Sequence, residues 1–572
     1  MEEFLNLFTQ ADAVFFNVYT QILRYLAPIL TALLLLRCAL PLLVFRREPE
    51  IWALLDLPTG RVAIKHWENI IGRSPSSDVV LDLATVSKNH AVLTRYDDGS
   101  WTIADNGSKS GVKVNGNKVQ ICALEPEDVI EIGGVEMTLK PISRSQEIKL
   151  AHLRTKASSN FDSIANLLLL TVLQSLLCLG YLMTAQPGSV LSILLGFGGI
   201  VALQWLLLAF YILIRKPSFE VETIAFFLCT MGMTAIASVA PLEAGKQVLA
   251  LPLGVIVFLG IGWALRARER AKSVRYLAAV AGIGFLVITL LFGKEYYGAK
   301  NWIIIGGMSF QLSELSKICF VFVGASAMDR IVNKRNLILF IVYSVIICGC
   351  LALMNDFGTA LIFFVAFLVI AYMRSGSVGT VALACTSLGF AGVIALKIAP
   401  HALSRFTTWR HIWEDPYGAG YQQTRALMCI ASGGLFGLGA NQGWLDHVFA
   451  ADSDIVFATL SEEWGLLMAV MMVLCVLVLG LFVLRAASIQ RSSFYAIGGG
   501  AAAAILLVQT ILNVLGTLDV LPLTGVTFPF VSNGGSSMIG VWGLLAFVKA
   551  SDTRQNASFA VRQSKEGRPD DE

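Results

Sequence analysis

Several ionisable side chains of this 572-residue chain stand at the edges of long apolar stretches, where charge is costly and commonly has a function. Glu314 and Lys317 are spaced i, i+3 at the start of one stretch, so they share one helix face. Asp356 begins another stretch, and Glu462 and Glu463 lie early in a third. Each also has a structural explanation, as a self-neutralising pair or an anion at a helix start.

The longest polar segment between two apolar stretches contains further residues whose side chains could react or bind substrate. Asp415 lies in "EDPYGAGYQQ" (414–423), where a positioned carboxylate could take a proton from a hydroxyl. Alternatively, Asp415 is only a turn residue, since Asp-Pro favours turns. The neighbouring Glu414 is expected to be solvated. Arg405, Arg410 and Arg425 flank this segment and could hold phosphate.

Composition identifies the environment of these groups. The chain is 56% hydrophobic and 15% charged, against about 25% charged in soluble proteins, so it is expected to be an integral membrane protein. A net charge of +3 gives no argument for a nucleic-acid partner. The ten cysteines show no CxxC spacing, so neither a zinc site nor a disulfide framework is indicated.

Apolar runs of about 20 residues predict a polytopic helical membrane protein. We expect thirteen spans, near 22–45, 163–184, 189–214, 219–240, 247–265, 276–292, 314–332, 336–354, 356–372, 379–398, 456–484, 494–517 and 534–549.

Basic residues fix the expected orientation, because they stay on the cytoplasmic side. Arg46 and Arg47 follow the first span, so the N-terminus (in region 1–50) should lie outside. The remaining loops then alternate between the two sides of the membrane, and the basic-rich ones fall inside. The polar loop 399–455 lies outside, and residues 551–572 are expected to form a disordered cytoplasmic tail.

Residues 51–141 have a different pattern. Short β-branched runs alternate with a period of two and are separated by Asp-Gly, Asn-Gly and Gly-Gly turns, which predicts a cytoplasmic all-β sandwich. A linker at 142–160 and two additional spans at 161–216 follow it.

Within residues 51–141, the segments "IIGRSPSSDVVL", "VSKNHAVL" and "DNGSKSGVKVNG" resemble the motifs of the forkhead-associated (FHA) domain. The resemblance implies that Arg73 and Ser87 hold a phosphothreonine phosphate, assisted by Lys88 and Lys109. Ser110 stands where Asn is common, which leaves the peptide preference open. Gly72, His90 and Asn115 would shape the loops. The implied partner is a phosphothreonine protein, for example a Ser/Thr kinase; the alternative is a docking surface without phosphate binding.

Six further motifs, in order, resemble the SEDS family of RodA/FtsW/SpoVE type. They are "GAKNWIIIGGMSFQLSELSK", "NDFGTAL", "EDPYGAGYQQTRAL", "GLFGLG", "SDIVFATLSEEWG" and "LPLTGVTFPFVSNGGSS". This similarity covers ten of the expected spans, in a core of residues 217–550. It implies a glycosyltransferase that polymerises lipid II at the outer face of the bacterial cytoplasmic membrane.

The SEDS resemblance also implies roles for the ionisable residues. Asp415 would be the catalytic base of an inverting displacement, as one base and no nucleophile suggest. Lys317, Glu314, Arg405, Asp356 and Asp454 would contact substrate. A divalent metal could share the charge of the pyrophosphate. No metal-ligand spacing is visible, so no metal ligand is assigned.

The chain departs from the family pattern at four positions, namely Leu312, Asn355, Ser453 and Asn533. A class B penicillin-binding transpeptidase is the partner implied by resemblance, since no SxxK transpeptidase motif is visible. Two other functions stay open: a lipid II flippase, and a non-catalytic scaffold that uses only the FHA domain.

Overall fold

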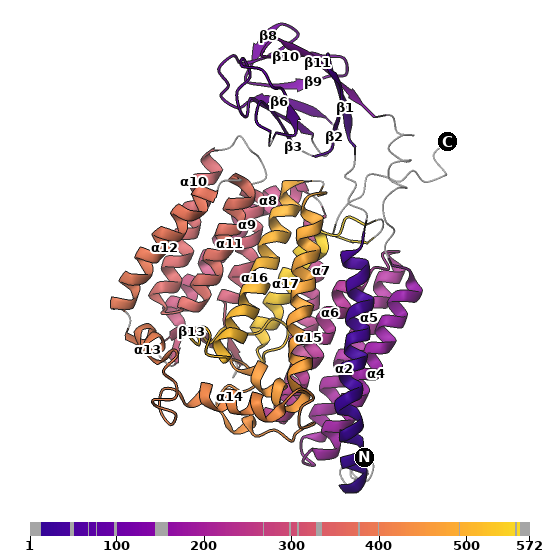
Figure 1. The fold of residues 1–572 in the computed structure, drawn as a ribbon, viewed down its shortest axis with the longest axis vertical. Coiled ribbons are helices and arrows are strands. Elements are labelled where there is room, and N and C mark those ends of the chain that lie inside the picture. The colour runs from indigo at the N-terminus through magenta and orange to yellow at the C-terminus, as the bar shows by residue number, and fades with distance from the viewer. Residues whose placement is uncertain are drawn as a thin grey trace.

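The computed structural model describes most of the chain, in ranges separated by short gaps. These ranges are 13–45, 51–66, 68–75, 77–95, 100–142, 158–266, 268–296, 299–305, 308–327, 334–375, 378–398, 400–490, 492–554 and 557–560. A β-sandwich lies at one end of a large helical bundle, and two short helices, α13 and α14, lie at the opposite end (Figure 1). We call these the sandwich end and the distal end.

Each expected span coincides with a helix. The helices are α2 (Ala13–Leu43), α4 (Asn160–Thr184), α5 (Val190–Leu213), α6 (Glu220–Val239), α7 (Gln247–Leu265), α8 (Arg268–Phe292), α9 (Ser313–Ala327), α10 (Lys334–Leu353), α11 (Phe357–Ser375), α12 (Val378–Ile398), α15 (Val456–Ala487), α16 (Ser493–Thr517) and α17 (Gly535–Ala550). Among the described residues, ten helices are long and apolar enough to cross a membrane. Helices satisfy their own backbone groups, which lipid requires.

The distal end carries shorter elements. These are α13 (Pro400–Thr408), α14 (Tyr421–Gly433), the 3-10 turns η1 (Pro241–Lys246) and η2 (Leu445–His447), and the antiparallel strands β12 (Lys294–Tyr296), β13 (Ala299–Ile305) and β14 (Met308–Phe310). The three-stranded sheet was not expected from the sequence, because its segment reads as a glycine-rich loop.

The sandwich consists of two sheets, as expected for 51–141. One has the order β2-β1-β11-β10-β7-β8 and the other β4-β3-β5-β6-β9. The strands are β1 (Ala53–Leu57), β2 (Gly60–Ile64), β3 (Glu68–Gly72), β4 (Val79–Val80), β5 (Ala91–Arg95), β6 (Trp101–Asp105), β7 (Val112–Val114), β8 (Asn117–Val119), β9 (Ile121–Leu124), β10 (Val129–Ile132) and β11 (Val135–Pro141). Leu55, Ile71, Leu93, Ile103 and Ile130 are fully buried between them. Because each strand turns one face to this core, apolar and polar residues alternate along its sequence.

Helices α2, α4 and α5 pack against α6 and α15 of the main bundle through polar contacts as well as apolar ones. Gln174 on α4 exchanges amide hydrogen bonds with Gln204 on α5 and also donates to Thr230 on α6, at 2.8 Å. The Tyr181 hydroxyl on α4 donates to the Glu463 carboxylate on α15. Buried hydrogen bonds hold helices together in lipid, so the additional pair is bound specifically.

Helix α15 is broken at Gly465, whose φ of +84° favours glycine. The break exposes backbone groups to the loop 433–439. Leu466 N–H donates to Gly434 O, and the N–H groups of Leu438 and Gly439 donate to carbonyls of the preceding turn, all at 2.9 Å. The segment "GLFGLG" therefore docks on the broken helix in addition to forming a turn, in which Gly437 N–H donates to Gly433 O at 2.8 Å.

A buried ionic cluster closes the sandwich end. Arg554 is 3% exposed and donates to Asp552, to Glu220 on α6 and to the Pro41 carbonyl at the end of α2. Lys549 on α17 pairs with the neighbouring Glu222 at 3.2 Å. Residues 551–554 and 557–560 are thus packed on the bundle, where we expected the disordered tail to begin. A basic residue with two acidic partners provides the reason for this packing.

Replacing Arg554 by Ala should lower the stability of the whole bundle. Glu220 and Asp552 would be left buried without their cation, a situation that costs about 3–5 kcal/mol. The midpoint of thermal unfolding of the detergent-solubilised protein should fall by several degrees. Arg61→Ala, which removes a solvent-exposed arginine from β2, is the matched control, and an equal shift in both variants would contradict the role of the cluster.

The sandwich also touches the bundle away from its chain connections. Arg374 in the last turn of α11 lies 3.8 Å from the Glu68 carboxylate at the start of β3. The two side chains are only 14% and 5% exposed. The other end of α11 begins one residue after Asp356, so one helix runs from this contact to the distal end.

Candidate functional site

A cavity of about 900 Å³, lined by apolar and polar residues, lies toward the distal end of the bundle. Its volume is near the upper end of small-molecule sites, about 300–1,000 Å³. Residues of the three-stranded sheet, the start of α11, α13, the loop before α15, the loop after α16 and the start of α17 line it. The polar and charged ones are Asn301, Ser309, Gln311, Asn355, Asp356, Thr359, Arg405, Ser453, Asp454, Thr524, Thr527, Asn533, Ser536 and Ser537.

Asp356 caps α11, as its structural explanation predicts, and it also lines the cavity. Its Oδ1 accepts from the Thr359 N–H at 3.1 Å, which caps α11, and its Oδ2 accepts from Gln311 Nε2 at 3.3 Å in the cavity wall. The preceding Asn355 has a φ of +58°, which a proline cannot adopt. The departure from the family's Pro therefore changes the turn before α11 and leaves Asp356 in the cavity. Gln311 had no assigned role, although it stands in a quoted motif.

Asp454 shares this cavity with Arg405. It lies in the loop before α15, and its backbone carbonyl accepts from Asn513 on α16 at 2.9 Å. Burial raises the pKa of Asp454 to about 6, while the charge of Arg405 acts in the opposite direction. Arg405 comes from α13 and donates to the Thr524 carbonyl at 3.0 Å. The cavity thus combines a carboxylate whose pKa is raised by burial with a fixed cation.

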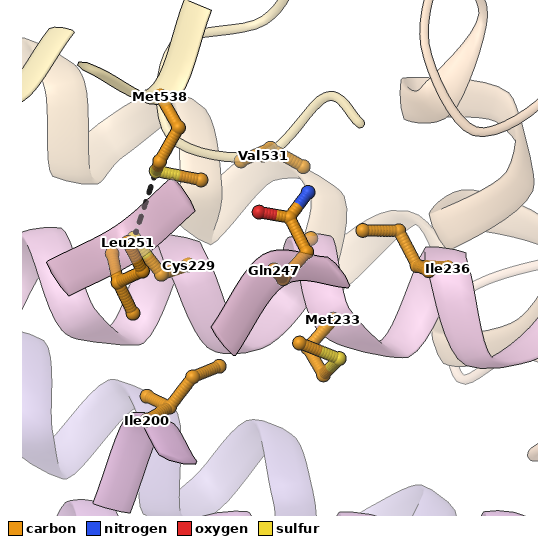
Figure 2. Close-up of a pocket in the computed structure, with 9 residues that line it drawn as sticks. Ile200, Cys229, Met233, Ile236, Gln247, Leu251, Val531 and Met538 are labelled. Carbon is orange, nitrogen blue, oxygen red and sulfur yellow. Dashed lines mark hydrogen bonds between the residues drawn. The ribbon is translucent and has the colours of Figure 1, made fainter. Parts of the chain in front are cut away.

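Asn533, where the family has Tyr, ties the cavity wall to the bundle interior. Its amide donates to Asp452 at 2.7 Å and accepts from Gln247 on α7 at 3.1 Å. Gln247 also lines a gap of about 10 Å³ among apolar side chains of α5, α6, α7 and α17, including Cys229 and Met538 (Figure 2). That gap is too small for a ligand and marks the packing seam between α5 and the bundle.

Glu314 and Lys317 do not line the cavity. They form a 2.7 Å ion pair on α9, and their side chains are 4% and 1% exposed. Gln311, three residues before Glu314, and Ser536 at the start of α17 do line the cavity. In this arrangement the pair neutralises itself inside the bundle, which was the structural alternative for it.

Asp415 is exposed, and the cavity lining does not include it. Its Oδ1 accepts from Gly418 N–H at 3.0 Å and its Oδ2 from Ala419 N–H at 2.9 Å, so the side chain closes its own loop. Glu414 pairs with His411 at 2.9 Å and is exposed, as expected. The catalytic role of Asp415 stays a prediction, and in this conformation the carboxylate acts as a turn residue.

In the sandwich, three loops meet around a buried histidine. His90 Nδ1 accepts from the Ser87 N–H at 3.1 Å, so its Nε2 carries the proton and donates to Gly111 O. The chain at Gly72 passes so close to the Lys88 carbonyl that a Cβ would collide with it. Asn115 shapes the β7–β8 turn with a φ of +50°. These three residues shape loops, as the motif pattern predicts.

The same loops bring the expected phosphate-binding residues together. Arg73 N–H donates to Ser87 O at 3.0 Å, and Lys109 N–H donates to Ser87 Oγ at 3.2 Å. The side chains of Arg73, Lys88 and Lys109 are exposed. Ser110 instead turns its hydroxyl to the Thr85 carbonyl at 3.1 Å. Three cations around a hydroxyl can accept a phosphate, whereas Ser110 acts in the loop.

The fold and the cavity define a polytopic helical membrane protein with a polar site at one end and a phosphopeptide-type β-sandwich at the other. Residues 221–556 match the FtsW/RodA/SpoVE family of cell cycle proteins, and residues 69–133 match the FHA domain family. The chain therefore belongs to the FtsW/RodA/SpoVE family and carries an FHA domain. Both expected resemblances are confirmed.

Named relatives agree with the family. The peptidoglycan glycosyltransferase RodA of Mycobacterium bovis is 30% identical over 327 residues, covering 54% of this chain and 69% of its own. A probable peptidoglycan glycosyltransferase FtsW of Tolumonas auensis is 30% identical over 363 residues, covering 59% and 93%. A solved chain from a peptidoglycan synthase complex aligns with 58% of this chain and 96% of its own, at 24% identity and a TM-score of 0.49.

Proposed function

We propose that this chain is a peptidoglycan glycosyltransferase that polymerises lipid II and is regulated through its FHA domain. The observation that carries this proposal is the cavity at the distal end, which joins Asp356, Arg405 and Asp454. Family membership and the names of the relatives supply the reaction. Helix α13, which contributes Arg405 to the cavity, lies at the opposite end of the bundle from the FHA domain, which fits catalysis on one side of the membrane and regulation on the other (Figure 1).

The reaction forms a bond between the 4-hydroxyl oxygen of one lipid-linked sugar and C1 of another. The bond from C1 to the undecaprenyl pyrophosphate oxygen breaks, and the hydroxyl proton passes to a carboxylate. Arg405 is suited to bind the pyrophosphate, because its guanidinium offers several charge-assisted hydrogen bonds. Asp356 and Gln311 are suited to bind sugar or peptide groups, because they face the cavity and already hold each other.

Two carboxylates compete for the role of base. Asp415 was assigned from the motif order, and it would need its loop to move toward the substrate. Asp454 is supported by its place in the cavity and by a pKa of about 6, which suits a base that works near neutral pH. We therefore favour Asp454 as the proton acceptor and Asp415 as the residue that shapes the neighbouring loop.

Orientation and partners follow from charge and family. The basic segments between spans support an orientation with the FHA domain in the cytoplasm and the distal end outside the bacterial membrane. Lipid II is the substrate, and a class B penicillin-binding transpeptidase is the membrane partner that would cross-link the product. A phosphothreonine protein, such as a Ser/Thr kinase, is the partner of the FHA loops.

Polymerisation by the purified chain tests this function directly. The full-length protein in lipid nanodiscs, given lipid II and its cognate transpeptidase, should form glycan chains that a muramidase degrades. A flippase would instead move labelled lipid II across vesicles without forming polymer. A scaffold would do neither but would still bind phosphopeptide. Either of these results would contradict the proposed enzyme.

A further inference from the structure

Aromatic side chains gather at the cavity and in the segments beside it. Phe406, Trp409 and Phe449 line the cavity itself. Tyr421, Tyr417 and Trp413 follow on the start of α14 and the loop before it. We call these six residues the aromatic track. Figure 1 shows that α13 and α14, which carry or flank most of it, lie together at the distal end.

Specific contacts hold the track in place. Gln422 in the first turn of α14 donates to the Phe449 carbonyl at 2.9 Å, which joins the outer part of the track to the cavity rim. The rings of Phe406 and Trp409 pack edge to face at 6.3 Å, and Trp409 Nε1 donates to the Val520 carbonyl at 3.2 Å. The inner rings are therefore positioned before any ligand arrives.

The outer rings are fixed by a cation and yet stay open to solvent. The Arg425 guanidinium lies 5.4 Å from the centre of the Tyr417 ring and 5.1 Å from that of Tyr421. Tyr417 is nevertheless 83% exposed and Trp413 is 56% exposed. Asp415 closes the loop that carries Tyr417. Because these rings are already held in place, a ligand that binds them would cost less side-chain conformational entropy.

We propose that the aromatic track binds the growing glycan strand as it leaves the cavity. Pyranose rings present C–H faces that pack on aromatic rings, and their hydroxyls reach polar groups beside them, such as Gln422. The proposal rests on the polymerase function, because only a polymer must leave the cavity while its end stays inside. The contacts that link Phe449 to Gln422, and Tyr421 and Tyr417 to Arg425, give such a strand a route across the distal surface.

Binding of a soluble strand tests the track without requiring catalysis. The probe is a linear hexamer of β-1,4-linked N-acetylglucosamine, titrated against the full-length protein in nanodiscs. The double variant Trp413→Ala/Tyr417→Ala should bind it about tenfold more weakly, the expected size for losing two ring contacts. Trp263→Ala is the control, because Trp263 on α7 is 59% exposed but lies outside the track. Equal binding by wild type and the double variant would overturn the proposal.

Product length provides a second measurement. The double variant should consume lipid II within about twofold of the wild-type rate but release shorter chains, because a strand held less tightly dissociates sooner. Glycan chains of unchanged length would overturn the proposal that the track binds the growing strand. A wild type that binds the hexamer but makes no polymer would contradict the polymerase function and leave the track supported.

The same rings could instead lie in the lipid interface or bind another protein. Quenching of Trp413 fluorescence by nitroxide lipids, taken as the difference between wild type and Trp413→Phe, would show lipid contact and overturn the proposal. Retained hexamer binding in the double variant, combined with lost transpeptidase binding, would also overturn it in favour of a protein surface. Quenching by aqueous acrylamide alone supports the glycan track.

Discussion

Asp454→Asn should reduce lipid II polymerisation by about 100-fold or more, the usual loss when a general base is removed. The amide keeps the size of the carboxylate and cannot accept the hydroxyl proton. Because Asp454 lies half-buried in the cavity wall, the change should leave lipid II binding and the melting midpoint close to wild type. The initial rate of glycan formation by purified protein measures the effect.

Asp415→Asn is the matched control for this experiment. Its side chain would still offer one oxygen to the loop N–H groups that Asp415 now holds, so we expect a loss of only a few fold. The reverse ranking, with a severe defect for Asp415→Asn and a mild one for Asp454→Asn, would return the base to the external loop and require that loop to close over the substrate.

The pH profile provides an independent readout of the same assignment. The reactive form of Asp454 is the deprotonated carboxylate, and burial raises its pKa to about 6. The turnover rate should therefore be nearly constant above pH 7 and fall as the pH drops through 6. In Asp454→Asn the residual rate should lose this inflection, and an inflection that persists there belongs to another group.

Arg73→Ala should weaken the binding of a phosphothreonine peptide by about 10- to 100-fold, the range for losing hydrogen bonds to a charged group. Arg73 is exposed beside Ser87, and its backbone N–H already joins the two loops. The truncated side chain should therefore remove phosphate contacts without unfolding the sandwich. Calorimetric titration of the full-length protein with a phosphothreonine peptide and its unphosphorylated form measures the loss.

Arg61→Ala provides the control for charge alone. Arg61 lies on β2, pairs with Asp56 and is well exposed, so its removal changes net charge by the same amount. Its peptide affinity should stay at the wild-type value. Equal losses in both variants would mean that the FHA domain attracts the peptide only through its overall charge, as the docking-surface alternative requires.

The sequence was most informative where one period dominates a segment. Apolar runs near twenty residues located all thirteen helices within a few residues in most cases, because lipid leaves a long apolar chain few alternatives. The largest boundary error is at α2, which starts at Ala13 rather than near residue 22. Its first turns contain Asn17, Tyr19 and Thr20, which broke the apolar pattern but do not break a helix.

The candidate site was harder, since its residues come from segments that meet only in three dimensions. Asp356, Arg405 and Asp454 were named from motifs and do share the cavity. The motifs assigned the base to Asp415 and a substrate contact to Asp454, although both are acidic residues of the same predicted external region. What separates them is that one faces the cavity and the other folds back on its own loop, and neither fact has a local sequence signal.

The ion pair between Arg374 and Glu68 has a consequence for how the FHA domain is held. The two side chains are largely shielded from solvent, so the pair is weakened by salt less than an exposed pair would be. The FHA domain and the bundle also belong to one chain, and linkage within a chain creates an effective concentration near the millimolar range. A contact too weak to join two separate proteins can then contribute to the orientation of the domain on α11.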